Sequence, residues 1–498
     1  MPSRKWTTEQ KQCIDARGGT VLVSAAAGSG KTSVLVQRVI GLITDPENPV
    51  DVDRLLVVTF TKAAAAEMKQ RLSAALSALI AERPEDRRLG RQQMLLPRAH
   101  ISTVHSFCSA LLRENFHLLD ISPQFKVAED ADVRTMQQEA LAEVMEAAYE
   151  ARDPAFLALA ELLSGGRDDR KLTEAVLRLY TFIQSHPFPN DWLQAQEALY
   201  ATNAPIANTT WGQTVRRYVS GTLHHGVAML RKAWSMATSE EQMAAAYAGP
   251  LLADCQQLEI LADNFDTEDN WDDAIDMLEQ FTFNRLGSLR QYPDELFKKR
   301  VTGLRDEVKK QLAALPALFC GSEAECREDI AVLRQPVTAL CALVRQFSDT
   351  YEQKKAAKHW VDFNDLEHLT LRLLLDRQEN GTVRRTPLAQ ELAQQFEEVL
   401  VDEYQDTNAA QDALFRAISR DEQNLFMVGD VKQSIYGFRQ AMPDIFLARQ
   451  KAYADYDGEH FPATITLGHN FRSRDTVTDS VNFVFSQLMS EQLGGLKV

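Results

Sequence analysis

A glycine-rich stretch near the start of the chain has the residue types that hold the phosphates of a nucleotide. Residues 24–32 read SAAAGSGKT, between the apolar run TVLV and the helix-like SVLVQRVI. A phosphate loop turns backbone N–H groups inward at a helix N-terminus, where a lysine reaches the β and γ phosphates and a hydroxyl binds magnesium. Gly28 and Gly30 let the backbone bend, because glycine adopts conformations closed to other residues. The stretch therefore predicts a site for ATP and Mg²⁺.

The loop departs from the pattern GxxxxGK[ST] at its first position, where Ala25 replaces glycine. A small-residue turn between a core strand and a core helix is the alternative interpretation. The strand-like run before the loop and the helix-like run after it favour the phosphate loop. The predicted nucleotide-binding residues of this stretch are Ala25, Ala26, Ala27, Gly28, Ser29, Gly30, Lys31 and Thr32, with Thr32 also a magnesium ligand.

A second stretch supplies the acids that ATP hydrolysis needs. VLVDEYQDT places two carboxylates directly after an apolar run. Asp402 suits the metal, and Glu403 suits a base that takes the proton of the attacking water. A capped loop after a core strand is the alternative.

Five short apolar runs predict the sheet that positions these residues. Besides TVLV, they are LLVVTFT (55–61), ISTVHSF (101–107), EVLVDEYQD (398–406) and LFMVGD (425–430). Unbroken apolar runs that end in polar or small residues are typical of buried parallel strands whose carboxyl ends carry a site. We therefore expect an α/β fold with a doubly wound parallel sheet.

The sheet domain is predicted to be split by a large helical insert. Residues 1–115 and 360–460 would form the α/β domain, and 116–359 would form the insert, where apolar residues recur at helical spacing. The strand-like run ATITL at 463–467 would open a further domain over 461–498. An acidic run (263–280) and a basic run (296–312) in the insert are interpreted as solvated helix faces, although the basic run could also contact a nucleic-acid backbone.

Composition narrows the possible classes of protein. The 498 residues carry a formal charge of −16, which weighs against a nucleic-acid partner but does not exclude a local basic groove. We found no apolar run of about 18 residues and no apolar stretch typical of a secretory signal, so we expect a cytoplasmic protein without a membrane span. The six scattered cysteines are expected to be reduced packing residues.

Seven stretches in a fixed order resemble the motifs of the superfamily 1 DNA helicases of the UvrD, Rep and RecB kind. They are TEQ, AAAGSGKT, VVTFTKAAAAEM, TVHSFC, VDEYQDTN, VGDVKQSIYGFRQA and LGHNFRS. The resemblance implies a RecA-like motor domain (1A), an inserted domain (1B), the start of a second motor domain (2A), and movement from 3′ to 5′ on single-stranded DNA.

Further details resemble the AddA type of helicase/nuclease polypeptide in bacterial AddAB recombination complexes. They are AAAGSGKTSVLVQR, KQSIYGFRQAMPDIF and SHPFPNDW. This implies a role in processing double-strand breaks for recombinational repair, a nuclease domain, and a second subunit of the AddB type. Because the later motifs of that family were not found before Val498, we expect the chain to be a truncated part of a longer protein.

The resemblance also implies roles for single residues. Gln10 would recognise adenine, Gln433 would sense the γ phosphate, and Arg472 would be an arginine finger. The residues implied to contact DNA are Phe60, Thr61, His105, Tyr436, Phe438 and Arg439, of which Phe60, His105 and Phe438 could instead be core residues.

Three other functions remain open from the sequence. The chain could be an ATP-binding switch or scaffold that does not move along DNA. It could be another phosphate-loop enzyme such as a kinase, although the string QSIYGFR argues against this. It could also be a repair helicase without a nuclease.

Overall fold

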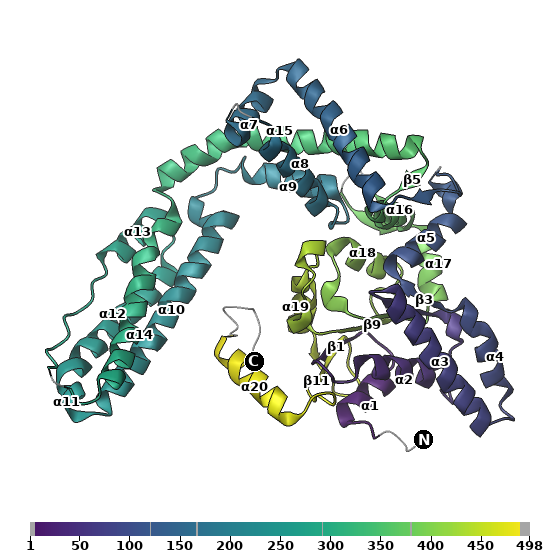
Figure 1. The fold of residues 1–498 in the computed structure, drawn as a ribbon, viewed down its shortest axis with the longest axis horizontal. Helices are drawn as coiled ribbons and strands as arrows, with labels where there is room; N and C mark the ends of the chain where they lie inside the picture. The colour runs from purple at the N-terminus through teal and green to yellow at the C-terminus, as the bar shows by residue number, and fades with distance from the viewer. Residues whose placement is uncertain (1–4, 120, 166–167, 291, 379–380, 489–498) are drawn as a thin grey trace. The chain divides into compact units, whose positions relative to one another are not determined.

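The computed structural model describes residues 5–119, 121–165, 168–290, 292–378 and 381–488 of the chain. These residues form two compact units (Figure 1). The first unit contains the large sheet and comprises the described residues up to 151, then 169–192, and those from 343 onward. The second unit is helical and comprises 152–168 and 193–342.

A seven-stranded parallel sheet forms the centre of the first unit. Its strands are β1 (Val21–Ala25), β2 (Leu55–Thr59), β3 (His100–Thr103), β8 (Glu398–Val401), β9 (Leu425–Gly429), β10 (Ala454–Asp455) and β11 (Ala463–Leu467). They stand in the order β10, β11, β1, β9, β8, β2, β3, and every neighbouring pair is parallel. The loops that follow β1, β8 and β9 therefore leave the sheet at the same edge.

Alternate residues of each central strand enter two separate cores. In β2, Leu55 and Val57 belong to one core, and Leu56 and Val58 belong to the other. Because both faces are covered, these strands are unbroken apolar runs in the sequence. The first core is covered by α1 (Thr8–Asp15), α2 (Lys31–Ile43), α3 (Lys62–Glu82) and α4 (Arg87–Leu95), and the second by α5 (Val104–Glu114), α16 (Phe363–Leu374), α17 (Pro387–Gln395), α18 (Ala409–Ala417) and α19 (Pro443–Ala452).

The remaining elements of the first unit lie outside this sheet. Two small sheets pair β4 (Lys126–Val127) with β5 (Trp360–Val361), and β6 (Leu375–Arg377) with β7 (Val383–Arg385). The further helices are α6 (Asp130–Ala151), α8 (Arg170–Ile183) and α20 (Asp475–Leu488), and two helices, α9 (Pro189–Leu199) and α15 (Glu323–Ala357), have residues in both units. The α/β fold with a parallel sheet and a large helical insert is confirmed.

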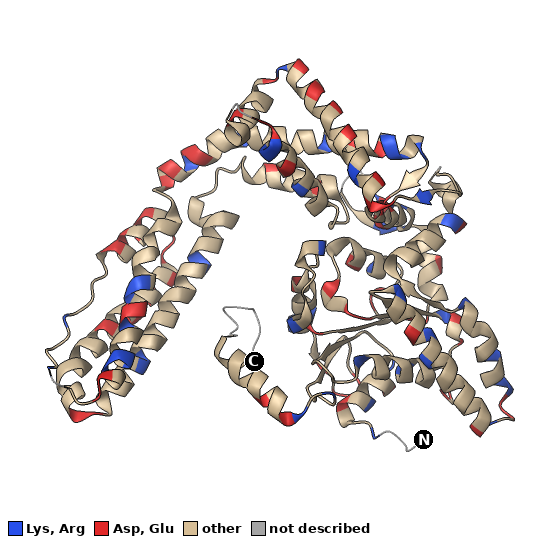
Figure 2. Cartoon of the chain, viewed as in Figure 1, with Lys and Arg blue, Asp and Glu red and all other residues tan. Residues whose placement is uncertain are grey.

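The second unit is a set of packed helices. They are α7 (Pro154–Ser164), α10 (Thr210–Thr238), α11 (Glu241–Met243), α12 (Gly249–Thr267), α13 (Trp271–Gln280) and α14 (Glu295–Ala314), with parts of α9 and α15. The acidic and basic runs lie on these helices, and both signs of charge are spread along them (Figure 2). In α14, Val301 and Val308 are buried while Lys299 and Lys309 are exposed, as expected for a solvated helix face. No helix of the described residues is long and apolar enough to cross a membrane.

The structure differs from the sequence-based boundaries in three places. Strand β11 pairs with β1, so 463–467 belong to the sheet of the first unit and not to a domain that begins at 461. The sequence could not reveal this, because an apolar run does not specify which sheet it joins. The second unit is also shorter than the predicted insert 116–359, since α6, α8 and the end of α15 belong to the first unit.

The third difference concerns the run at 101–107, where the strand ends at Thr103. The Thr103 hydroxyl accepts a hydrogen bond from the Ser106 backbone N–H and caps α5, so the second half of the run is helical. The last ten residues assigned to the further domain, 489–498, lie outside the described residues.

A buried ion pair joins α2 to β8 and gives a test of the fold. Arg38 is 2% exposed, its Nε lies 2.5 Å from Glu398 Oε1, and its Nη1 donates to the Cys13 carbonyl oxygen. We expect Arg38→Ala to lower the free energy of unfolding by about 3–5 kcal/mol, because the Glu398 carboxylate would stay buried without its partner. Urea denaturation followed by tryptophan fluorescence measures this.

The matched control is Arg178→Ala, which breaks an exposed pair with Glu174 at 3.8 Å. Its effect should stay within about 1 kcal/mol. Equal losses in the two variants would contradict the assignment of Arg38 as a buried anchor.

Candidate functional site

The loop after β1 has the backbone shape that a phosphate loop requires. Gly28 and Gly30 have φ angles of +72° and +90°, a region that favours glycine, and Gly30 is the residue before α2. A Cβ on Gly28 would lie only 2.7 Å from Asn470 Oδ1, so glycine is also needed for close approach. The N-terminus of α2 and the glycine-rich turn thus lie at the carboxyl edge of the sheet.

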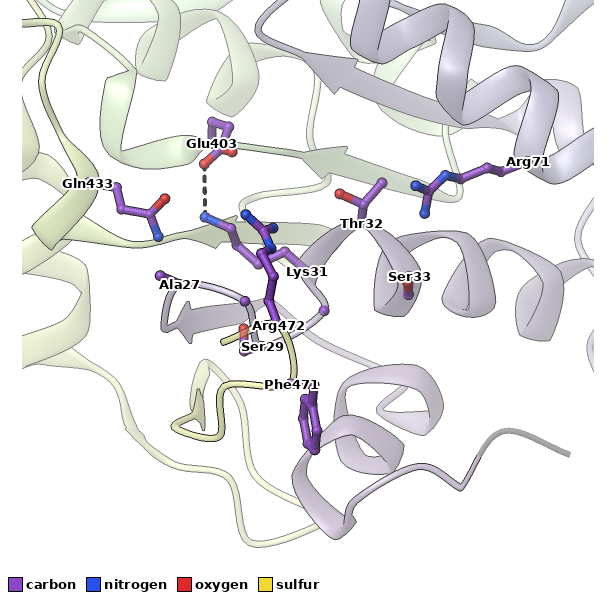
Figure 3. A pocket seen from close by; sticks show the side chains of 12 residues that line it. Ala27, Ser29, Lys31, Thr32, Ser33, Arg71, Glu403, Gln433, Phe471 and Arg472 are labelled. Carbon is purple, nitrogen blue, oxygen red and sulfur yellow. Dashed lines mark hydrogen bonds and ion pairs between the residues drawn. The ribbon is translucent and has the colours of Figure 1, made fainter. Parts of the chain in front are cut away.

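A cavity of about 460 Å³ opens at this edge (Figure 3). It is lined by Ala27, Gly28, Ser29, Gly30, Lys31, Thr32, Ser33, Arg71, Glu403, Gln433, Phe471 and Arg472. Nine of these twelve residues were predicted from the sequence to bind the nucleotide or take part in hydrolysis. The structure therefore brings together residues from the start and the end of the chain in one place.

Lys31 and Glu403 both line the cavity and form an ion pair there. Lys31 Nζ lies 3.1 Å from Glu403 Oε2, and Gln405 Nε2 donates to the same oxygen at 3.0 Å. Glu403 has a φ of +51°, an uncommon conformation for a residue with a side chain and one that often occurs at functional sites. The carboxylate is thus held in place by a cation and an amide, and remains partly exposed to the cavity.

Asp402, the residue before Glu403, does not line the cavity; it is half-buried, and its Oδ1 atom is shielded from solvent. Burial, reinforced by the neighbouring Glu403 charge, raises the pKa of Asp402 to about 6. Its Oδ1 has no hydrogen-bond partner. A buried carboxylate oxygen without a partner fits a ligand of a hard cation, and the Thr32 hydroxyl in the cavity is a second oxygen of the kind that magnesium prefers.

The strand β9 delivers Gln433 to the same cavity. Asp430 follows β9 and accepts a hydrogen bond from Gln433 Nε2 at 2.6 Å. Its backbone N–H donates to Gln405 Oε1 at 2.9 Å, so the segments after β8 and β9 are tied together.

Arg472 comes from the loop after β11. The Phe471 N–H donates to the Gly28 carbonyl oxygen at 3.0 Å, and Asn470 Oδ1 accepts from the Arg472 N–H at 2.8 Å. A Cβ on Gly28 would lie 3.0 Å from the Cβ of Arg472, and the Arg472 side chain lines the same cavity as Lys31 (Figure 3). Its guanidinium is therefore available to a phosphate bound there.

Three of the predicted ATP-binding residues do not line the cavity. Ala25 is the buried last residue of β1, and Ala26 donates its N–H to the Leu467 carbonyl oxygen. Gln10 is buried and donates from Nε2 to the Ser29 carbonyl oxygen at 2.9 Å, while its Oε1 accepts from the Thr7 N–H. In this structure Gln10 therefore stabilises the phosphate loop through its hydrogen bond to Ser29.

The sequence-based prediction missed Ser33, Arg71 and Phe471, which also line the cavity. Arg71 lies on α3 and pairs with Glu67 at 2.5 Å. The helix after β2 carries basic residues, which could have suggested an additional phosphate contact. The sequence alone does not show whether the side chain of Lys69 or that of Arg71 faces the phosphate loop.

Four of the residues predicted to contact DNA gather in one aromatic cluster. The ring centroids of Phe60 and Tyr436 are 4.7 Å apart, and those of Tyr436 and Phe438 are 5.7 Å apart. The Arg439 guanidinium lies 5.4–5.8 Å from all three ring centroids. Phe438 is 74% exposed, so it is not a core residue and offers its ring to solvent.

Thr61 and His105 are placed outside this cluster. Thr61 caps α3, since its hydroxyl accepts from the Ala64 N–H. His105 is in the first turn of α5, after β3, and β3 pairs with β2 beside Phe60. The His105 ring centroid lies 5.0 Å from that of Phe363, a half-exposed residue that the sequence-based prediction missed because no motif pointed to it.

Comparisons with known proteins agree with this geometry. Residues 6–454 match the family described as UvrD/REP helicase N-terminal domain. The chain is 42% identical over 517 residues to a Moorella thermoacetica protein named as the A subunit of an ATP-dependent helicase/nuclease, covering 99% of this chain and 36% of that protein. The protein of the same name from Acetivibrio thermocellus is 41% identical over 503 residues, covering 99% and 40%. The chain thus spans less than half the length of these curated relatives.

The raised pKa of Asp402 predicts a stability effect with a defined sign. The folded state favours the protonated carboxyl, so this contribution to stability is present below about pH 4 and is lost as the pH rises through about 6. We expect Asp402→Asn, measured without metal or nucleotide, to raise the free energy of unfolding by about 3 kcal/mol at pH 8 and by about half that at pH 5. Urea denaturation at both pH values tests this, and a variant less stable than the parent at pH 8 would contradict it.

Proposed function

Since the chain belongs to the UvrD/REP helicase family, we propose that it is the ATP-hydrolysing motor part of a DNA helicase that moves from 3′ to 5′ on single-stranded DNA. The observation that carries the proposal is the single cavity that joins the phosphate loop, Glu403, Gln433 and Arg472. The aromatic cluster of Phe60, Tyr436 and Phe438 supports DNA as the second ligand.

The nucleotide phosphates lie over the loop from Ala27 to Thr32. The inward N–H groups and Lys31 bind the β and γ phosphates. Thr32 and Asp402 would hold Mg²⁺, which would neutralise charge on the phosphate oxygens. Because Lys31 pairs with Glu403 in this structure, a bound γ phosphate competes for the lysine and frees the carboxylate. Gln10 acts at the adenine end of the site, next to the loop that it supports.

Hydrolysis uses the residues around the γ phosphate. Glu403 accepts the proton of the water whose oxygen attacks phosphorus, and the bond to the β phosphate oxygen breaks. Arg472 stabilises the charge that develops on the γ phosphate oxygens. Gln433 contacts the γ phosphate, so its position depends on whether that phosphate is bound. A change in the position of Gln433 also changes that of the following segment, which carries Tyr436, Phe438 and Arg439.

Single-stranded DNA lies on the aromatic cluster and its surroundings. Bases stack on Phe60, Tyr436 and Phe438 in any sequence, since every base has a π face. Arg439 contacts the backbone phosphates. Thr61 and His105 extend the contacts along the ends of β2 and β3, and Phe363 adds an exposed ring beside His105.

We further propose the context suggested by the names of the relatives. The chain acts within a helicase-nuclease polypeptide that works with an AddB-type partner to process double-strand breaks for recombinational repair. This proposal rests on relatives that are named as one subunit of an ATP-dependent helicase/nuclease.

The role of Lys31 gives the first test. Lys31→Ala should lower the DNA-stimulated ATPase rate by at least about 100-fold, because the site loses the cation that contacts the β and γ phosphates. The measurement is phosphate release with and without single-stranded DNA. Lys171→Ala, an exposed lysine on α8, is the control and should behave as the parent. A parent chain without ATPase activity, or a fully active Lys31→Ala variant, would refute the proposed site.

The exposed ring of Phe438 gives the second test. Phe438→Ala should weaken binding of an oligo-dT strand roughly 5- to 150-fold, because one stacked base contributes about 1–3 kcal/mol. Phe438→Trp should retain the affinity, since it keeps a stacking face. Phe483→Ala removes an equally exposed ring on α20 and is the control. Fluorescence anisotropy measures the affinities, and equal binding by the parent and Phe438→Ala would exclude stacking on this residue.

A further inference from the structure

A buried carboxylate on α16 has no role in the chemistry proposed above. Glu367 is only 3% exposed, and its Oε1 lies 3.0 Å from His105 Nε2. The same oxygen accepts a hydrogen bond from Gln411 Nε2 at 2.7 Å. A carboxylate removed from water must have such partners, because an unpaired buried charge is strongly unfavourable. Glu367 therefore joins two side chains from different helices through one atom.

The first of these side chains lies on the proposed DNA side. His105 is in the first turn of α5, its side chain is 38% exposed, and it packs beside the half-exposed ring of Phe363. Because Glu367 contacts Nε2, the orientation of the imidazole depends on this carboxylate. The ring can turn freely only if the contact with Glu367 is lost.

The second side chain belongs to the segment that carries the acids of the nucleotide site. Gln411 is in the first turn of α18, and its backbone N–H donates to the capping residue Asn408 at 2.8 Å. The Thr407 N–H in turn donates to the Tyr404 carbonyl oxygen at 3.1 Å. The hydroxyl of Tyr404, next to Glu403, is bonded to Asp412 on α18.

Each step from His105 to Glu403 is thus a short contact between packed side chains or neighbouring backbone groups. Glu367, Thr407 and Tyr404 on this path are buried, whereas Asn408 and Gln411 are half-buried. The two ends of the path reach the two proposed ligand sites. A bond through a single shared oxygen transmits a change in position, because moving one partner changes the geometry of the other. Such a path supports coupling only if both ends are shown to depend on it.

We propose that Glu367 is a positioning residue that couples DNA contact at His105 to ATP hydrolysis at Glu403 through Gln411 and α18. The inference rests on the proposed function and adds a residue to it. The charge of Glu367 contacts neither DNA nor nucleotide. Its acceptor oxygen holds His105 and Gln411 in one arrangement, and the binding of a DNA strand to His105 favours the arrangement in which Glu403 is active.

The test measures ATP turnover by the full chain with and without saturating oligo-dT. Glu367→Leu should reduce the ratio of stimulated to DNA-free turnover about tenfold and leave the half-saturating ATP concentration within about twofold of the parent value. Glu367→Gln should recover at least half of the stimulation, because an amide oxygen can still accept both hydrogen bonds. The exposed Glu391→Leu on α17 is the matched control.

Two further variants separate coupling from simple loss of structure. Gln411→Leu breaks the far end of the path without touching His105 and should show the same reduced ratio, whereas Gln394→Leu on α17 should not. Combining His105→Ala with Glu367→Leu should reduce the ratio no further than the more defective single variant, since both act on one path.

Several results would overturn the inference. They are an unchanged ratio in Glu367→Leu or in Gln411→Leu, an equal loss of turnover with and without DNA, no recovery in Glu367→Gln, and additive losses in the double variant. These results would leave the proposed function standing as long as the parent chain is stimulated by DNA. A parent chain with no stimulation would overturn the proposed function and this inference with it.

Discussion

The contact between Lys31 and Glu403 depends on the parallel direction of the strands that precede them. The two residues are 372 positions apart in the sequence, yet their charged atoms lie 3.1 Å apart. They meet because β1 and β8 flank β9 and all three strands run the same way, so that their following loops share one edge. Gln433 and Arg472 reach the cavity by the same rule, after β9 and β11. The site is therefore a consequence of strand order more than of any local sequence.

The local parts of this arrangement could be predicted from the sequence. The glycine positions, the apolar runs and the acids after β8 each carry their own signal, and nine predicted residues line the cavity. What could not be predicted depends on long-range packing. The run ATITL does not reveal that it pairs with β1. The sequence around Arg71 does not reveal that this side chain faces the cavity. Glu367 cannot be told apart from the other acidic residues until α5 and α18 are known to pack beside it.

The negative net charge of the chain gives no indication of DNA, its proposed partner. The formal charge of −16 is a sum over the whole chain, and exposed charges are screened beyond about 8 Å at physiological salt. The cluster of three aromatic rings around Arg439 is a local feature that the sum does not describe. Stacking on rings also needs little net positive charge, which fits a DNA-binding surface on an acidic protein.

The pairing of β11 with β1 also links the segment after β11 mechanically to the phosphate loop. Tension applied along α20 passes first into the loop that carries Arg472 and then into β11. Two backbone hydrogen bonds join this path to the phosphate loop, from Ala26 N–H to the Leu467 carbonyl oxygen and from Phe471 N–H to that of Gly28. A displacement of β11 or of the loop after it would therefore reach the phosphate loop, where the nucleotide would lie, through these two bonds.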